Sequence, residues 1–248
     1  QSHLVQESWG HLLRNFLIVA LVAASVWVLV SGVRFSIGYG SHFIFSPFEV
    51  EEPAAGHTGQ KTAETEAESE DGDMTTAWLI LFGVLVGGGL LRGLLIQLPS
   101  WRSSEGDGMG TSLEHFHATY DHPEEGHQPR YDQPDFAQAG RRAVMTTLTV
   151  GTGGSGGIEA PVVPIGECIG AGWSRLLKVP NPDDLRIFQM AGIAAAVVTL
   201  LDAPFTAALF AAEVIYTDRV LYRTLMYSLV AALVAYAMNN HFLDFQPL

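Results

Sequence analysis

The residues of this sequence that could do chemistry stand in one glycine-rich segment. Residues 151–161 read GTGGSGGIEAP, which brings the carboxylate of Glu159 to a point where a helix can begin. The first amides of a helix have no partner within the helix, and the helix dipole makes that end positive. An anion can be bound there without any full positive charge, and weakly enough to leave again. Glu159 would compete with the anion for these amides and swing away once protonated.

Two other interpretations of this segment stay open. The glycines could serve only close helix packing, with Glu159 an ordinary carboxylate in the first turn of a helix. The residues alone favour this interpretation and the anion site about equally. A nucleotide-binding loop is a weaker alternative, because the segment has no strand before it and no Gly-Lys-Ser/Thr sequence after it.

Other reactive side chains do not form a recognisable site. The single cysteine, Cys168, excludes an internal disulfide. No nucleophile, base and orienting acid stand at a recognisable spacing, so we do not expect an enzyme. Nor do we expect a metal or a cofactor, because no carboxylate or cysteine stands at a ligand spacing from the clustered histidines. Those histidines are His115, His117, His122 and His127.

Long apolar helices must position the glycine-rich segment. The chain is 48% hydrophobic and only 16% charged, which is typical of a membrane protein. Residues 16–33 carry no charge over a length that crosses about 30 Å of hydrocarbon as a helix. Residues 77–98 form a second apolar stretch of spanning length, in which the charged residue is Arg92, and we expect Arg92 to snorkel or to face protein.

The later part of the chain predicts interrupted helices. A span-like stretch breaks at the glycines of 151–157, and Asp202-Ala203-Pro204 predicts a helix end followed by a helix start. A break at membrane depth is tolerated only where the backbone is buried in protein or lines a wet cavity. We therefore predict an all-α membrane protein built from tilted, re-entrant and broken helices.

The amount and distribution of charge indicate what surrounds these helices and how they are oriented. The formal net charge of −13 and the lack of a basic stripe weigh against nucleic-acid binding. The expected partner is a lipid bilayer, because of the long apolar stretches. Basic residues flank the first two spans on the side that would place the N-terminus in the cytoplasm. The predicted segments are an N-terminal segment with the first span (1–48), an acidic solvated loop (49–76), the second span (77–100), a cytoplasmic loop (101–140) and a broken-helix region (141–248).

Two stretches resemble the CLC family of chloride channels and transporters. Residues 151–177 are similar to the family signature in which a GSGG run leads into Gly-Arg-Glu-Gly-Pro. Residues 183–216 resemble the next two family helices, including the Ala-Pro step and the Leu-Phe-x-x-Glu ending. The similarity extends over 106–239, and the first two spans fit the opening family helices more loosely. The resemblance implies the N-terminal half of the CLC fold and chloride as the transported ion.

The resemblance also implies roles for individual residues. Glu159 matches the gating glutamate, and residues 106–110 match the inner anion loop, usually Gly-Ser-Gly-Ile-Pro. Asp107 replaces the serine of that loop and should repel an anion unless it is protonated or turned outward. Ile158 and Ala160 replace the arginine and glycine that flank the gating glutamate. The anion-binding residues implied are Gly106, Asp107, Gly108, Met109, Gly157, Ile158, Glu159 and Ala160.

The mode of transport follows from a second position. Val214 stands where proton-coupled relatives carry the inner proton-relay glutamate, and relatives with an apolar residue there tend to be channels. We therefore expect passive conduction, with a proton-coupled antiporter and a non-conducting assembly subunit as alternatives. The second CLC half would come from the same gene product or from a separate chain. By analogy we expect a homodimer, or a component of a larger complex, in a bacterial-type inner or plasma membrane.

Overall fold

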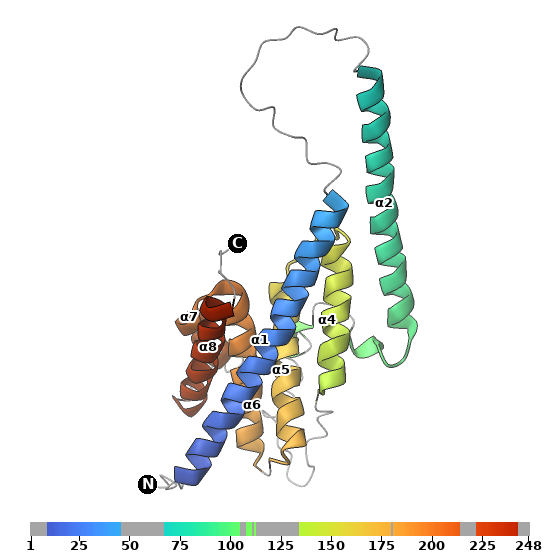
Figure 1. Cartoon of the computed structure of the whole chain (residues 1–248). Helices are drawn as coiled ribbons and strands as arrows, with labels where there is room; N and C mark the ends of the chain where they lie inside the picture. Colours follow the sequence, from blue (N-terminus) through green and yellow to red (C-terminus); the bar gives the residue numbers. More distant parts are fainter. Residues whose placement is uncertain are drawn as a thin grey trace, which may run out of the picture.

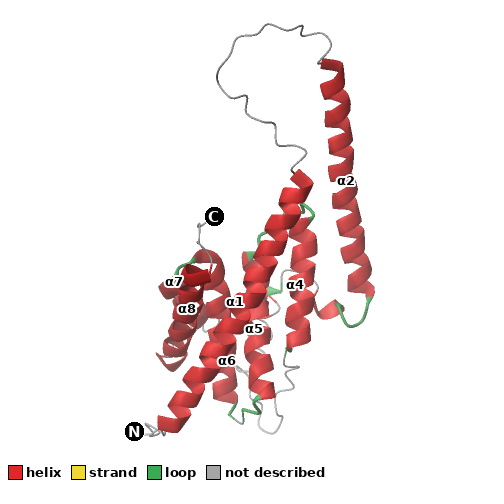
Figure 2. Ribbon diagram, in the orientation of Figure 1, coloured by secondary structure: helices red, strands yellow, loops and turns green. Residues whose placement is uncertain are grey.

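The structure, a computed structural model, is helical, with no strand in the residues that it describes (Figure 2). Those residues are 9–45, 67–104, 108–110, 112, 134–179, 181–213 and 222–242. The elements are α1 (Trp9–Phe45), α2 (Ala67–Gln97), the 3-10 helix η2 (Arg102–Ser104), α4 (Phe136–Gly151), α5 (Glu159–Leu176), α6 (Pro182–Leu201), α7 (Pro204–Glu213) and α8 (Tyr222–Phe242).

Three helical segments among the described residues are long and apolar enough to cross a membrane. They are Gly10–His42, Trp78–Gln97 and Asp183–Leu201. The first contains the predicted span 16–33, and the second lies within the predicted span 77–98. The predicted fold class, an all-α membrane protein, is confirmed. The helix α2 begins at Ala67, so residues 67–76 of the expected acidic loop continue the second helix. Glutamates are good helix formers and are favoured near the positive end of a helix, which accounts for the extension.

The centre of the helix bundle is α6. It packs against α1, α5, α7 and α8, and Phe188, Met190, Ile193 and Val198 on it are at most 1% exposed. A helix that is apolar on every side is typical of a core position. Figure 1 shows α1 running obliquely across this bundle, whereas α2 stands to one side and packs mainly against α4 and η2.

Glycines bring the backbones of α5 and α6 together. A Cβ added at Gly166 would collide with the carbonyl oxygen of Gly192, and one added at Gly192 would collide with that of Gly166. A Cβ at Gly170 would likewise meet the carbonyl oxygen of Phe188. Small residues allow the two backbones to come this close. Lipid is as apolar as the side chains, so within a membrane helices associate through such close packing rather than through the hydrophobic effect.

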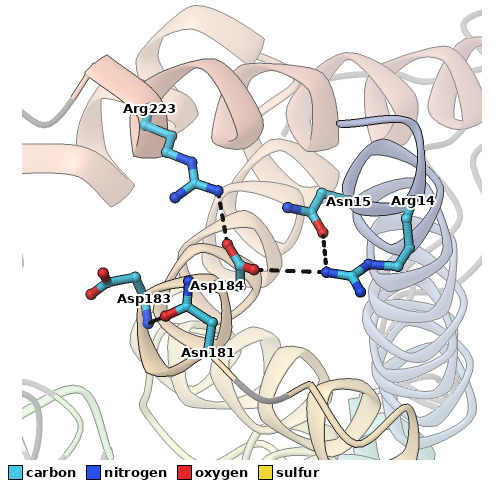
Figure 3. A network of polar contacts seen from close by, with 6 residues as sticks. All are labelled: Arg14, Asn15, Asn181, Asp183, Asp184 and Arg223. Carbon is cyan, nitrogen blue, oxygen red and sulfur yellow. Dashed lines mark hydrogen bonds and ion pairs between the residues drawn. The ribbon is translucent and has the colours of Figure 1, made fainter. Parts of the chain in front are cut away.

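A charge cluster of Arg14, Asp184 and Arg223 joins three helices at the N-terminal end of α6 (Figure 3). Asp184 is 5% exposed and its carboxylate lies 2.9 Å from Nη2 of Arg223 on α8 and 3.9 Å from Nη2 of Arg14 on α1. Asp183 beside it is exposed, and its backbone N–H donates to the Oδ1 of the N-cap residue Asn181. The buried carboxylate thus ties the ends of α1, α6 and α8.

The break between α6 and α7 lies where the sequence predicts it. Asp202 ends α6 in a left-handed conformation (φ 54°), and α7 begins at Pro204. The carboxylate of Asp202 accepts a hydrogen bond from Nδ2 of Asn239 on α8 (3.2 Å). The Oδ1 of Asn239 in turn accepts one from Nε1 of Trp27 on α1 (2.7 Å). The break is therefore held by side chains from two other helices.

Candidate functional site

The glycine-rich segment forms a tight reversal between α4 and α5. Gly153 has a φ of 87°, which a residue with a side chain rarely adopts. The amide of Gly154 donates to the carbonyl oxygen of Thr149 (2.9 Å), and a Cβ at position 154 would collide with that oxygen. These two glycines are required by the turn itself. The reversal starts α5 at Glu159, the residue that the sequence places at a helix start.

A cavity of about 630 Å³ opens between this reversal and the neighbouring helices. Ser155, Gly156, Gly157 and Glu159 line it from the reversal and the first turn of α5. The remaining wall comes from further residues of α5 and from α2, η2, α4, α6 and α7, together with Met109. The cavity is thus a meeting point of segments that are far apart in the sequence.

Glu159 is exposed at the start of α5. Its carboxylate lies back over Gly157, since a Cβ at position 157 would collide with Oε2 of Glu159. Within the described part of the chain, no residue forms an ion pair with this carboxylate. The N-cap residue Ile158 offers no side-chain hydrogen bond to the first amides of α5. The start of α5 therefore presents amides without a side-chain cap, beside a carboxylate that no salt bridge holds in place.

The structure brings half of the eight predicted anion-site residues to the cavity wall, namely Met109, Gly157, Glu159 and Ala160. The side chain of Ile158 packs against the hydrophobic core, and Gly108 is buried and lies against the guanidinium of Arg142. The other predicted positions lie outside the described residues, and these are Gly106, Asp107 and Val214. The histidines His115, His117, His122 and His127 also lie outside them.

The glycine-rich segment does not predict two guanidinium groups that also line the cavity. Arg142 on α4 is 5% exposed and lies directly against Gly108, where a Cβ would collide with its guanidinium. Gly108 has a φ of 80°, so this position favours glycine for its conformation as well. Arg92 on α2 lines the same cavity, so it faces protein, one of the two outcomes expected from the sequence.

Helical spacing could have predicted the position of Arg142. Thr146 and Thr149 follow it at i+4 and i+7 and line the cavity with it, so the three residues share one face of α4. That face leads directly into the glycine-rich reversal. The position of Arg92 carries no such signal, because the part of α2 after residue 76 is apolar on all sides and its sequence does not reveal which side meets protein.

Comparison with known families decides the identity of the chain. Residues 88–248, more than half of the 248 residues, match the family described as voltage gated chloride channel. The chain belongs to the voltage-gated chloride channel family. A comparison with individual curated proteins finds no match. The predicted CLC membership is thereby confirmed, and the chain is an integral membrane protein of a family of chloride channels and transporters.

The match to the voltage-gated chloride channel family covers the whole cavity. Its lining residues run from Arg92 to Phe210, all within the matched region. By contrast, α1 and the first part of α2 precede Gly88, where the match begins. The family relationship therefore applies directly to the segments that form the cavity.

Proposed function

We propose that this chain is a subunit of a chloride channel in which Glu159 gates passive conduction through the cavity. The observation that carries the proposal is the carboxylate of Glu159, which lies over Gly157 at the start of α5 on a cavity wall that also holds two guanidinium groups. This arrangement sets a movable negative group against positive groups that attract a chloride ion.

The gate works by competition. The first amides of α5 stabilise either the ionised carboxylate or an anion, by about 0.3–1 kcal/mol for an exposed helix end. While Glu159 is ionised it occupies the amides and repels chloride from them. Protonation removes its charge, and the carboxyl group leaves the amides to the ion. The weak interaction suits conduction, because an ion that binds too tightly does not leave.

Passive conduction is favoured over proton exchange by position 214. Proton coupling requires a second carboxyl group that carries protons from the inner side, and the valine at that position cannot do so. The departures from the family pattern at Asp107, Ile158 and Ala160 favour the second candidate, a non-conducting assembly subunit.

The proposal also includes the orientation of the chain in the membrane and its assembly with a second half of the fold. Arg14 and Lys178 line one small pocket, and Arg223 pairs with Asp184 at the same end of α6 as Arg14. Basic residues gathered at one end support a cytoplasmic N-terminus by the positive-inside rule. The complete pathway would form with a second half of the CLC fold, in a homodimer or a larger complex in a bacterial-type membrane.

Chloride efflux from liposomes that contain the full-length protein tests the proposal. Glu159→Gln should raise efflux at neutral pH several-fold and abolish its rise on acidification, because the amide cannot ionise. Glu213→Gln is the matched control, since Glu213 is an exposed carboxylate at the end of α7 that does not line the cavity. It should behave as the unmodified protein.

Other results would replace the proposal by one of its alternatives. No chloride efflux from the unmodified protein, together with no effect of Glu159→Gln, would indicate an assembly subunit. Uphill proton movement driven by a chloride gradient would indicate an antiporter, and would show that a group other than position 214 carries the protons.

A further inference from the structure

A small pocket opens on the surface of the bundle where the start of α1 meets the end of α5. Its volume is about 330 Å³, and no carboxylate is among its described lining residues. Two of those residues are basic, Arg14 and Lys178, and the other five are leucine, isoleucine or valine. The pocket therefore combines positive charge with apolar surface, and none of its residues lines the cavity of Glu159.

The charged and the apolar parts of the pocket lie at different depths along α1. Arg14, Leu17 and Leu21 stand at i, i+3 and i+7, so they share one face of the helix. Arg14 lies two residues before the uncharged stretch 16–33, which puts it at the level of lipid headgroups, whereas the leucines lie within that stretch, at the level of acyl chains. Leu17 is 65% exposed and Leu21 is 41% exposed, so both can contact a lipid chain.

The backbone of Lys178 has a conformation that suits glycine better. Lys178 follows the end of α5 with a φ of 50°, and the N–H of Val179 donates to the carbonyl oxygen of Ser174 (3.0 Å). Helices that end in this way usually have glycine at the left-handed position. The turn itself therefore does not account for a lysine. Among the described residues its ammonium group forms no ion pair, so its charge is available to a ligand.

The guanidinium of Arg14 also has N–H groups available. Its Nη2 lies 3.9 Å from the carboxylate of Asp184 and 3.4 Å from Oδ1 of Asn15, both long contacts, and the side chain is 43% exposed. A guanidinium carries five N–H groups in a geometry that suits the oxygens of a phosphate. The hydrogen bond from Nε1 of Trp173 to Oγ of Ser25 (3.0 Å) joins α5 to α1 about one turn beyond the pocket. The two helices that carry the basic residues are therefore fixed to each other.

We infer that this pocket binds an anionic phospholipid, with the phosphate between Arg14 and Lys178 and an acyl chain along Leu17 and Leu21. Charge and depth together select this ligand, because a bilayer presents phosphate at the level of the basic residues and hydrocarbon at the level of the leucines. A headgroup with a net negative charge is favoured over a zwitterionic one, since each basic residue near the surface raises the affinity about fivefold. The inference goes beyond the proposed function and does not depend on whether the protein conducts chloride.

Native mass spectrometry of the full-length protein in detergent tests the inference, because it resolves bound lipids one by one. The two probes are phosphatidylglycerol and phosphatidylcholine with the same acyl chains, and the first should bind at least tenfold more tightly. Lys178→Gly should weaken the binding of phosphatidylglycerol about fivefold and leave that of phosphatidylcholine unchanged. The variant should fold, because glycine adopts a φ of 50° more easily. Lys178→Arg keeps the charge and should keep the affinity.

A second basic residue of α5 provides a matched control. Arg175 is exposed in the last turn of the helix and does not line the pocket. Its charge acts on the helix dipole and on an anionic surface much as that of Lys178 does. Arg175→Gln should therefore leave the affinity for phosphatidylglycerol unchanged. Leu21→Ala should weaken the binding of both lipids to a similar degree, because their acyl chains are the same.

Three results would overturn the inference. The same affinity for phosphatidylglycerol in Lys178→Gly as in the unmodified protein would show that the lysine only completes the end of α5. An equal loss of affinity in Arg175→Gln would show attraction to a charged surface without a site. Displacement of the lipid by an equal concentration of glycerol phosphate would indicate a site for a soluble phosphate. None of these results bears on the gate at Glu159, since chloride efflux is not part of the measurement.

Discussion

At the scale of single residues, Gly157 determines where the carboxylate of Glu159 can lie. The carboxylate occupies the space that a Cβ at position 157 would need, whereas a Cβ at Gly156 would meet nothing within 4 Å. Both glycines line the cavity. The two positions therefore separate the effect of displacing the carboxylate from the effect of adding a methyl group to the wall.

Gly157→Ala should release the gate without unfolding the protein. The added methyl group would push away the end of a flexible side chain rather than backbone, so the cost in stability should be small. Efflux at neutral pH should rise towards that of Glu159→Gln, and its dependence on pH should weaken. Gly156→Ala, measured in the same liposome assay, should retain the original pH dependence. Equal behaviour of the two variants would contradict the placement of the carboxylate over Gly157.

Residue chemistry could be predicted from the sequence only in part. The glycine-rich segment and Glu159 carry a local signal, because a glycine run before a carboxylate and a proline indicates a helix start. Ser104, which is 3% exposed and lines the cavity, carries no such signal, since one serine in a polar segment resembles any other until packing buries it. At Ile158 the resemblance implies a place in the anion site, and the structure adds that its apolar side chain packs against the core.

At the scale of helices, the contact between α5 and α6 depends on glycines that face each other. Gly192→Ala should destabilise the protein by about 1–3 kcal/mol, because the added methyl group meets the backbone of Gly166, which cannot move aside freely. Gly93→Ala on α2 is the control, since a Cβ there would meet nothing within 4 Å. It should be neutral or slightly stabilising, as alanine is the better helix former.

Labelling of the single cysteine can measure the stability of these two variants. Cys168 lies on α5 and is 1% exposed, so a thiol-reactive dye should label it only when the contact between α5 and α6 opens. The midpoint temperature of labelling in detergent should fall by several degrees in Gly192→Ala and stay the same or rise in Gly93→Ala. Unchanged midpoints in both variants would show that the two helices can separate slightly at little cost.

Hydropathy predicts which helices are apolar but not what surrounds them. Both α2 and α6 have the composition of a membrane span, yet Trp78, Leu79 and Phe82 on α2 are exposed while Phe188 and Met190 on α6 are fully buried. Lipid and protein interior are equally apolar, so the two environments select the same residues. The close approach of α5 and α6 and the position of Arg92 could not be predicted for this reason.

At the scale of the whole molecule, the charge cluster of Arg14, Asp184 and Arg223 connects helices from the start, middle and end of the described chain (Figure 3). Asp184→Asn should lower stability by about 1 kcal/mol, because both arginine side chains are partly exposed and water takes over part of the lost interaction. Asp183→Asn is the neighbouring control, and its carboxylate points away from both arginines in Figure 3.

Measurements at two salt concentrations check that the loss of stability in Asp184→Asn is electrostatic. The difference in labelling midpoint of Cys168 between Asp184→Asn and the unmodified protein should shrink at 1 M salt, which screens partly exposed charges. Asp183→Asn should match the unmodified protein at both salt concentrations. A loss of stability in Asp184→Asn that did not change with salt would point to packing rather than to charge.

The position of α1 has a consequence for how the protein can be divided. Val19, Val22, Val26 and Val30 form a stripe along α1 whose side chains are fully buried, and the helix packs against α4, α5, α6 and α8. This helix precedes the region that matches the family. A truncated protein that began at Gly88 would keep every residue of the cavity and still lose the helix that closes one side of the core. The boundary drawn by family similarity is therefore not a boundary of folding.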